Sequence, residues 1–417
     1  MYRVSDFLPR FALALLAGAG LATLWANMAP ADYYDAIEFR LMDLALPNWL
    51  APLPVSLTPL LIVTEALMAL FIGVIGKELW EAMVLGRGAL RGRHALFPLA
   101  LALGAMAGSV AVWSLSPALL GTLFGIGAVE LPGMAGWTVP LGADVALSYL
   151  FGRWIFGPGH PALHLLVLVA LACDGLALAA LALTEGLSSW RPLWLCLPVL
   201  AALAVWRAFG HPPLPGATER QRRAGLRLWP YILAGLLSWA GVIAAGLPGA
   251  LGLLPVIPAI AHADRSYGVF AKVEEILHDP LNRLVQWLAW PLVPVLFGFG
   301  FLHGGIDLSA FAPETLRLLA SLWIGRPVGM LCFGLGLAFA VRLPRTAGAG
   351  LPQILAICGI MGMAFTIPLV AIETALPGGA MQEAARLGLA LSLLAGPMTL
   401  LITRLAMRPR KRSAPSH

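Results

Sequence analysis

The sequence predicts an all-α polytopic membrane protein with about 12 transmembrane helices, and three observations lead to this fold class. Of the 417 residues, 59% are hydrophobic and 12% are charged, whereas a soluble domain carries about 25% charged residues. The hydrophobic residues gather in runs that reach the roughly 17–25 residues needed to cross a bilayer as a helix. The Lys and Arg residues lie between these runs, so the net charge of +6 favours anchoring at anionic lipid over binding to nucleic acid.

The hydrophobic runs can be followed along the whole chain. They are centred near residues 19, 66, 105, 144, 172, 199, 237, 254, 288, 328, 364 and 394. No polar mature domain follows the first run, residues 11–29, so we interpret it as a span and not as a cleaved signal. Gly and Pro interrupt several runs, most clearly the fourth (residues 132–149), the eighth (residues 247–260) and the eleventh (residues 354–375).

These spans predict one transmembrane domain in two halves. The halves cover residues 1–210 and 228–406, and the polar segment 211–227 joins them. We interpret this segment as a solvated linker, with a regulatory or lipid-binding loop as the alternative. A basic tail, residues 407–417, follows the second half.

The distribution of basic residues sets the expected orientation. With an even number of spans both termini lie on one side, and that side carries 22 of the 27 Lys and Arg residues; the other side carries four, and Arg326 lies inside a span. Short cytoplasmic loops are enriched in Lys and Arg. We therefore expect a multi-pass protein of the bacterial inner membrane with both termini in the cytoplasm.

Two aspartates, Asp144 and Asp174, stand alone inside the fourth and fifth runs. A charged residue at the centre of a bilayer costs about 2.5–3.5 kcal/mol on insertion scales, so such a residue usually serves an ion or proton path. Two of them on neighbouring spans indicate a cation or proton site. The alternative for Asp174 is a structural carboxylate bonded to a backbone amide.

Helix-breaking residues precede one of these aspartates. Pro140 and Gly142 weaken the helix before Asp144 and free backbone groups beside its carboxylate. A second break is expected in the eleventh run, at residues 359–368. Interrupted spans at corresponding positions in two halves point to a transporter site, where half-helix ends and unwound carbonyls meet an ion. The alternative is that Gly and Pro are simply frequent in membrane helices.

Arg326 lies inside the tenth run, and a guanidinium group does not lose its proton in proteins. A permanent charge at this depth needs an anion or water nearby. We therefore expect Arg326 to be the charge partner of Asp144 or Asp174. The alternative is a side chain that extends to the membrane surface.

Further ionisable residues lie within or beside the spans: Glu65 in the second run, Glu78 at its end, and Glu274 and His278 before the ninth. Because His titrates near neutrality, Glu78, Glu274 and His278 are candidates for a pH-sensing or cation-attracting funnel, with ordinary interfacial charge as the alternative. The sequence has no nucleotide-binding loop, zinc-ligand spacing or nucleophile elbow. We therefore expect no enzyme activity, no cofactor and no metal beyond a transported ion.

Six segments carry a resemblance to a known family. They are Thr64–Phe71, Lys77–Leu79, Val139–Ala146, Leu168–Leu183, Ile324–Gly329 and Gly359–Ile367. The chain resembles the NhaA-type sodium/proton antiporter family, as a divergent member, in these segments. They occur in the same order as in that family and on the corresponding predicted spans. That family is itself one of the examples behind the rule on interrupted spans, so the rule adds no independent support.

The resemblance implies inverted repeats whose broken fourth and eleventh helices cross near the membrane midplane. By position, Asp144 and Asp174 resemble the family's site aspartates, and Thr366 lies in the matching segment of the eleventh helix. Glu65 falls where the family has an aspartate. Glu78 falls on a cytoplasmic glutamate that is linked to the pH response of the family.

Three neighbours of the site depart from the family pattern. Ala143 stands where a threonine is usual, Cys173 where an aspartate is usual, and Arg326 where a lysine is usual. The site therefore has one hydroxyl and one carboxylate fewer. It also has a permanent guanidinium charge in place of an exchangeable ammonium group.

These features predict alternating access in which a proton and Na⁺ or Li⁺ compete for Asp174, assisted by Asp144, in the service of pH and sodium homeostasis. If Asp144 does not titrate, the exchange is one for one and electroneutral. The expected partners are these ions, membrane lipid and a second copy of the chain. The second copy is expected because residues 31–54 lie where family members have a dimer-forming hairpin.

Two alternatives remain open. A homologue that does not transport, or that transports another substrate, would keep the fold for a regulatory role, and Asp174→Asn would leave that role intact. An intramembrane aspartyl protease would also need two aspartates. Its usual Gly-x-Gly-Asp run is absent, since Leu141 and Ala143 precede Asp144, and a charged Arg326 would disfavour the proton that the two carboxylates of such an enzyme share.

Overall fold

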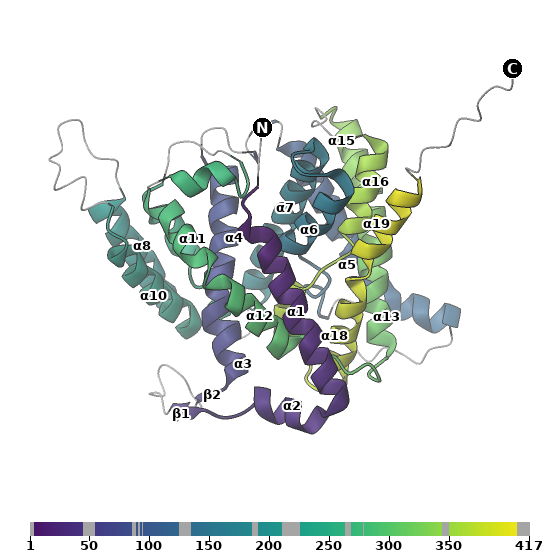
Figure 1. The fold of residues 1–417 in the computed structure, drawn as a ribbon, viewed down its shortest axis with the longest axis horizontal. Helices are drawn as coiled ribbons and strands as arrows, with labels where there is room; N and C mark the ends of the chain where they lie inside the picture. The colour runs from purple at the N-terminus through teal and green to yellow at the C-terminus, as the bar shows by residue number, and fades with distance from the viewer. Residues whose placement is uncertain are drawn as a thin grey trace, which may run out of the picture.

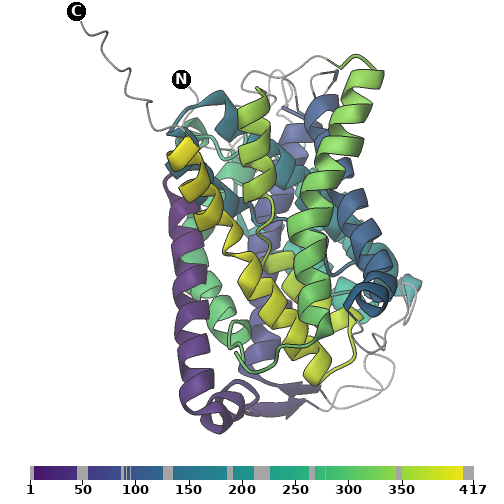
Figure 2. The ribbon, with the colours of Figure 1, turned by 90° about the vertical axis from the view of Figure 1, so that its right-hand side faces the viewer.

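A computed structural model describes residues 4–44, 55–85, 89–90, 92–93, 95–124, 135–185, 191–210, 226–262, 268–277, 279–343 and 350–406. This part of the chain is a bundle of helices (Figures 1 and 2). Its sheet consists of two short antiparallel strands, β1 (Met42–Leu44) and β2 (Val55–Leu57). The prediction of an all-α fold is therefore confirmed.

Seven helices of the described chain are long and apolar enough to cross a membrane. They are α1 (Phe7–Met28), α3 (Pro59–Leu61) with η1 (Ile62–Leu67) and α4 (Met68–Met83), α5 (Leu96–Phe124), α7 (Pro161–Glu185), η2 (Pro192–Leu195) with α8 (Cys196–Phe209), the run Pro313–Ala340, and α18 (Ala380–Ser392) with α19 (Ala395–Ala406). The protein is thus a multi-pass membrane protein.

The remaining predicted spans coincide with bent or shorter helices. α11 (Pro280–Ala289) and α12 (Leu292–His303) meet at an angle of 56° and together would make an eighth span. The shorter apolar helices are α6 (Val145–Phe156), α10 (Trp229–Ala244), η3 (Gly249–Leu251) with η4 (Leu254–Ala259), α16 (Leu351–Ile360) and α17 (Thr366–Ala375). Every predicted centre falls on one of these helices or within a few residues of an end. The total of 12 spans stays a prediction.

The run from Pro313 to Ala340 is less regular than the sequence predicts. It consists of α13 (Pro313–Ala320), the π-helical turn η6 (Ser321–Gly325), α14 (Arg326–Gly329), a second π-helical turn η7 (Met330–Leu335) and α15 (Gly336–Ala340). π turns inside α-helices are rare and frequently occur at functional sites. Here they lie on either side of the short helix that carries Arg326.

Small residues let this irregular helix approach α5 closely. A Cβ atom on Gly108 would lie 2.1 Å from the carbonyl oxygen of Gly325, so a glycine is required at this contact. Packing through small residues is a common way for membrane helices to associate. It places Arg326 next to Ser109 of α5, with 3.4 Å between Nε and Oγ.

The bundle has two opposite ends. α1 begins and α19 ends at one of them, which we call the terminal face (Figure 1). α2 (Pro30–Ile37) and the β1–β2 pair lie at the other, which we call the hairpin face. β1 lies within the segment 31–54 in which a hairpin was expected, while β2 follows it. Residues 211–225 of the predicted connector and the whole basic tail lie outside the described residues.

Candidate functional site

The chain is irregular just before α6. Residues 141–144 belong to no helix or strand, and Gly142 has a φ of +79°, a conformation that glycine adopts without steric cost. Asp144 has an extended backbone and caps α6, because its Oδ1 accepts a hydrogen bond from the amide of Leu147 at 2.9 Å. Aspartate is favoured at this position since it satisfies an amide that the helix leaves free. The predicted break before α6 is confirmed.

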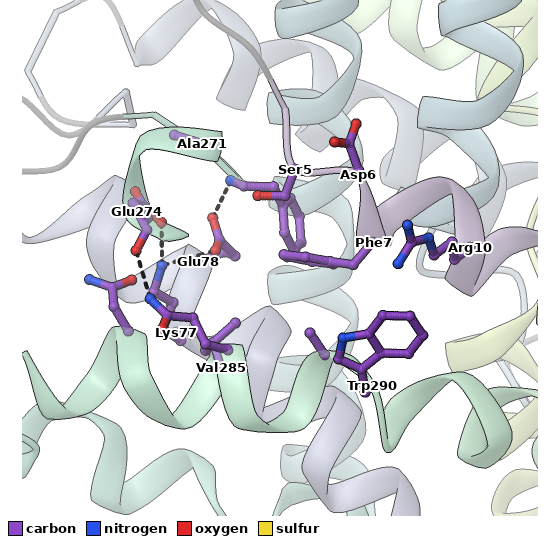
Figure 3. Close-up of a pocket in the computed structure, with 14 residues that line it drawn as sticks. Ser5, Asp6, Phe7, Arg10, Lys77, Glu78, Ala271, Glu274, Val285 and Trp290 are labelled. Carbon is purple, nitrogen blue, oxygen red and sulfur yellow. Dashed lines mark hydrogen bonds and ion pairs between the residues drawn. The ribbon is translucent and has the colours of Figure 1, made fainter. Parts of the chain in front are cut away.

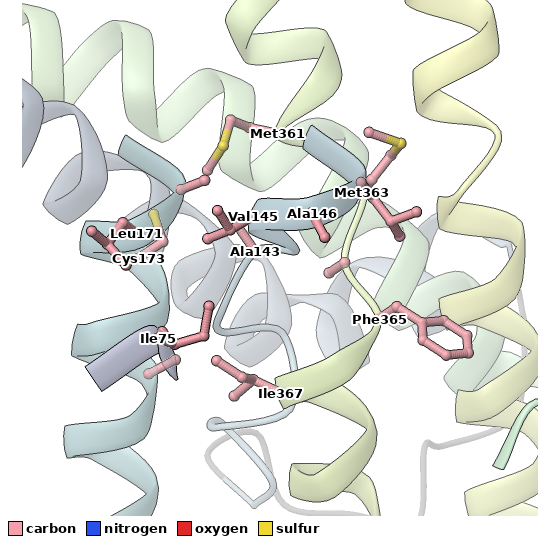
Figure 4. Close-up of a cluster of buried hydrophobic side chains, with 14 of the residues drawn as sticks. Ile75, Ala143, Val145, Ala146, Leu171, Cys173, Met361, Met363, Phe365 and Ile367 are labelled. Atoms are coloured by element: carbon pink, nitrogen blue, oxygen red, sulfur yellow. The ribbon is translucent and has the colours of Figure 1, made fainter. Parts of the chain in front are cut away.

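A second break separates α16 from α17. Residues 361–365 lie between the two helices, and Thr366 begins α17. The Thr366 hydroxyl donates a hydrogen bond to Asp144 Oδ2 at 2.7 Å. A Cβ atom on Gly142 would lie 3.0 Å from Cβ of Ile367. The two breaks therefore cross in direct contact, and buried apolar side chains pack around the crossing (Figure 4).

The crossing lies halfway along two neighbouring helices. Asp174 is at the middle of the 25-residue helix α7, and Arg326 is at the middle of the 28-residue run from Pro313 to Ala340. Helices of this length match the thickness of a bilayer core. Side chains at their centres are therefore far from both membrane surfaces.

Asp174 binds the same irregular segment that contains Asp144. Its Oδ1 accepts a hydrogen bond from the amide of Ala143 at 2.6 Å, and both aspartates are buried. Asp144 also faces the first turns of α6 and α17, where free amides leave a partial positive charge. The structure thus brings the two predicted carboxylates to adjacent residues of one unwound segment.

Arg326 joins the two breaks through their backbone carbonyls. Its Nη2 donates to the carbonyl oxygens of Pro140 and Gly142, each at 2.7 Å. Its Nη1 donates to those of Met361 at 2.7 Å and Met363 at 3.4 Å. Helix breaks leave carbonyls without partners, and the fork of donors on arginine satisfies several of them at once.

The prediction that Arg326 is the charge partner of Asp144 or Asp174 stays a prediction, since its charge acts on Asp174 but its hydrogen bonds run elsewhere. Its hydrogen bonds run to carbonyls of both breaks and to Ser109, and not to either carboxylate. Arg326 binds carbonyls because the two helix breaks leave several carbonyl oxygens without partners, and one guanidinium can donate to all of them. Arg326 still supplies a positive charge beside the two aspartates.

The two departures next to the aspartates leave few ligands. Ala143 contributes only its backbone amide, and the buried Cys173 places its Sγ 3.9 Å from the carbonyl oxygen of Ala102. Within the described ranges, no three His, Cys, Asp or Glu side chains are arranged to hold a metal ion. The ionisable groups at the crossing are thus Asp144, Asp174, Cys173 and Arg326.

A second charged cluster surrounds Lys77 of α4 (Figure 3), the helix that runs toward the terminal face in Figure 1. The buried Lys77 places its Nζ 3.0 Å from Glu78 Oε1, 2.8 Å from Glu81 Oε2 and 2.5 Å from Glu274 Oε2. Three carboxylates therefore surround one ammonium group. A cavity of about 320 Å³ beside them is also lined by Arg10 and other residues near the start of α1.

The acidic neighbours change the pKa of Glu274, which lies in η5 (Lys272–Ile276) outside the spanning helices. Burial raises the pKa of the Glu274 carboxyl to about 9, and the charge of Glu78 acts in the same direction against the attraction of Lys77. Glu78 and Glu274 thus lie in one cluster around Lys77, and their predicted part in a pH response stays a prediction. Glu81 was missed, although its spacing from Lys77 is that of neighbours on one helix face.

The other predicted pH-response residues lie elsewhere. Glu65 is in the π-helical turn η1, and its carboxylate accepts a hydrogen bond from the amide of Gly249 at the start of η3. It does not join the Lys77 cluster. His278 lies outside the described residues.

Fold and site together define a class: a polytopic membrane protein in which two broken helices cross at buried carboxylates, the architecture of secondary transporters. The family model described as Na⁺/H⁺ antiporter 1 matches residues 9–403. The chain therefore belongs to this antiporter family, and the resemblance seen in the sequence is confirmed.

Curated relatives agree with this assignment over almost their whole length. The Na⁺/H⁺ antiporter NhaA of Jannaschia sp. (strain CCS1) is 35% identical over 97% of this chain and 98% of its own. NhaA 2 of Pelobacter propionicus is 33% identical over 97% and 98%. NhaA of Geobacter sulfurreducens is 31% identical over 93% and 94%.

Proposed function

We propose that this protein is a secondary antiporter that exchanges Na⁺ or Li⁺ for H⁺, and that the two aspartates at the crossing carry the exchange. The observation that supports this most is that two buried carboxylates meet at one unwound segment: Asp144 belongs to it, and Asp174 accepts a hydrogen bond from the amide of Ala143 beside Asp144. Carboxylates buried in a membrane domain commonly form ion and proton paths. The names of the relatives are consistent with these ions.

Asp174 is the stronger candidate for the group that binds either a proton or a cation. Both oxygens of Asp144 accept hydrogen bonds, from Leu147 and Thr366. Asp174 accepts a hydrogen bond at Oδ1 from the amide of Ala143, and the amide of Val145 also acts on its carboxylate. Asp144 caps α6, whereas Asp174 lies inside the intact helix α7, so Asp174 can exchange a proton for a small cation without removing a helix cap. Asp144 and Thr366 would add oxygen ligands, which hard cations prefer.

The charges of the neighbours favour exchange of one proton for one cation. Arg326 keeps its charge, and the buried thiol of Cys173 is neutral in apolar surroundings. Both oxygens of Asp144 already accept hydrogen bonds and its carboxylate caps α6, so we take Asp144 as the group that keeps its charge. If only Asp174 changes its proton, one positive charge moves in each direction and the cycle is electroneutral.

The orientation follows from the basic residues. Since the side of the termini carries 22 Lys and Arg residues against four on the other, we place the terminal face in the cytoplasm and the hairpin face outside the inner membrane. The Lys77 cluster then lies on the cytoplasmic half, where it would respond to internal pH. The β1–β2 pair would be the contact of a homodimer.

The alternative is a regulatory homologue without transport, which the departures at Ala143, Cys173 and Arg326 keep open. A flux assay separates the two. Purified protein in liposomes loaded with a pH-sensitive dye should move protons when a Na⁺ gradient is applied. Asp174→Asn should abolish this flux, whereas Asp35→Asn, at an exposed position of α2, should not. Absence of flux in the parent protein would support the regulatory alternative.

A further inference from the structure

A separate group of buried polar side chains lies in the half of the bundle toward the hairpin face. His303 is the last residue of α12, and its Nε2 lies 3.1 Å from Oε1 of Glu373 on α17. The same nitrogen lies 2.8 Å from Oγ1 of Thr64 in η1. The His303 side chain is 0% exposed and that of Glu373 is 20% exposed. The glutamate is therefore the more exposed member of the pair.

The hydrogen bonds around the ring indicate where its protons lie. Nδ1 is 3.1 Å from the carbonyl oxygen of Phe299, which can only accept, so Nδ1 carries a proton. The Thr64 hydroxyl donates to the carbonyl of Leu60 at 2.9 Å and is therefore an acceptor toward Nε2. An ionised Glu373 also needs a donor. The contacts thus place one exchangeable proton between Nε2 of His303 and Oε1 of Glu373.

The charged groups that face this pair come from α18 and η1. Arg386 donates to Oε1 of Glu373 at 3.3 Å and to Glu383 at 2.9 Å. Glu65, the neighbour of Thr64 in η1, points its carboxylate at an amide of η3. Within the described chain, Glu373 is the acidic side chain that pairs with His303. Protonated His303 and Arg386 thus face Glu373 and Glu383, and Glu65 also interacts electrostatically with Glu373.

The α1–α2 corner contributes neutral groups that anchor the end of α12. The Tyr33 hydroxyl donates to the carbonyl of Phe301 at 2.8 Å, and the Thr23 hydroxyl donates to that of Gly304 at 2.7 Å. Tyr34 of α2 donates to Glu383 Oε2 at 3.4 Å. α12 is thus fixed to the scaffold, and the pair with Glu373 connects that scaffold to α17.

α17 is the helix whose first residue, Thr366, binds Asp144. Glu373 lies two helical turns further on, about 10 Å along the axis. The residues between them, 367–372, are all apolar. A proton on the pair therefore has no side-chain relay along α17 to the aspartates. The proton on this pair can influence the aspartates only through the position of α17, by keeping α17 attached to α12 or allowing it to move.

We propose that His303 and Glu373 form a second proton-binding site, open to the hairpin face, which ties α17 to α12 while the proton is bound. When His303 loses its proton to the solution through Glu373, the pair loses its attraction and α17 is free to move at the crossing. The role in transport rests on the proposed antiport function. The proton site itself does not.

The proton site is tested without any transport measurement. Purified protein labelled with ¹⁵N-histidine should show an imidazole signal of His303 in which both ring nitrogens carry a proton. That signal should disappear in His303→Gln and persist in His164→Gln. In Glu373→Gln, which keeps a polar group of the same size, the His303 ring should carry a single proton. A ring that carries one proton in the parent protein would overturn the site.

The role in transport is tested by Na⁺ efflux from right-side-out vesicles at fixed internal pH and varied external pH. The ion gradients that drive efflux are identical for parent and variants. A difference in the pH dependence of their efflux rates is therefore caused by the His303–Glu373 pair. His303→Gln and Glu373→Gln should still transport Na⁺. In both variants the change in efflux rate with external pH should be several-fold smaller than in the parent. Unchanged dependence in both variants would overturn the role of the pair. Absence of flux in the parent would instead refute antiport and leave the ¹⁵N result as the test of the site.

Discussion

The backbone amide of Ala143 donates a hydrogen bond to Oδ1 of Asp174 at 2.6 Å. This contact joins the middle of an intact helix to the break before another helix, one residue from a second buried carboxylate. It means that a change of charge on Asp174 acts directly on the unwound segment. The bond between Thr366 and Asp144 then carries that change to the second break.

Replacing Thr366 with valine should weaken both stability and cation binding. The variant keeps the shape but leaves one oxygen of the buried Asp144 without its donor, which costs about 1–3 kcal/mol. Unfolding in mixed micelles should show this loss, and cation affinity should fall several-fold. Thr374→Val is the matched control, since that hydroxyl binds only carbonyls of its own helix. Equal effects of the two variants would contradict the contact.

Replacing Arg326 with methionine should be more damaging. It removes a buried charge and leaves carbonyls of both breaks unpaired, and each buried polar group left without a partner costs about 1–3 kcal/mol. The apparent free energy of unfolding in mixed micelles is the measurement. Arg40→Met, at an exposed position, should change it by less than about 0.5 kcal/mol. A similarly small loss for Arg326→Met would show that the carbonyl contacts are not required.

Glu274 should make stability fall as the pH rises from acid to about 9. Its pKa is raised from 4.5 to about 9 in the folded protein, so its proton stabilises the folded state, and this contribution declines from about pH 4.5 and is gone above about pH 9. The reason is that ionisation of Glu274 adds negative charge to a buried cluster that already contains Glu78 and Glu81. Melting temperature from about pH 5 to about pH 9 should therefore fall less in Glu274→Gln than in the parent. Glu38→Gln, at an exposed position, should follow the parent curve, and parallel curves for all three proteins would refute the prediction.

Exchange in the parent protein should not generate a membrane potential. One proton at Asp174 for one Na⁺ moves no net charge, because Cys173 and Arg326 do not change charge at the crossing. A potential-sensitive dye in proteoliposomes should stay constant while Na⁺ drives proton flux. A potential that develops with the flux would show that a second group titrates, and Asp144 would be that group.

The sequence predicts the features of the crossing that depend on local chemistry. Lone aspartates in apolar runs mark Asp144 and Asp174, and glycine and proline mark both breaks, because each of these signals lies in neighbouring residues. The partners of Arg326 could not be found in this way. They are backbone carbonyls, which every residue has, and they become free only where the fold unwinds the helices.

Other groups were missed because their chemistry appears only in three dimensions. His303 and Glu373 are 70 residues apart in the chain, and they meet because the end of α12 lies next to α17 in the folded protein. Glu373 is an ionisable residue in an apolar run, and that signal alone would have justified attention. The bend between α11 and α12 and the π turns beside Arg326 also depend on packing, since local propensity does not fix them.

The central claim is that a proton and Na⁺ compete for Asp174, and proton release on Na⁺ binding tests it most directly. Detergent-solubilised protein in weakly buffered solution receives Na⁺ while a pH indicator records released protons, with choline as the control cation. The account predicts release of one proton per Na⁺ bound in the parent, the same in Asp35→Asn, and none in Asp174→Asn. Release from Asp174→Asn equal to that of the parent would contradict it.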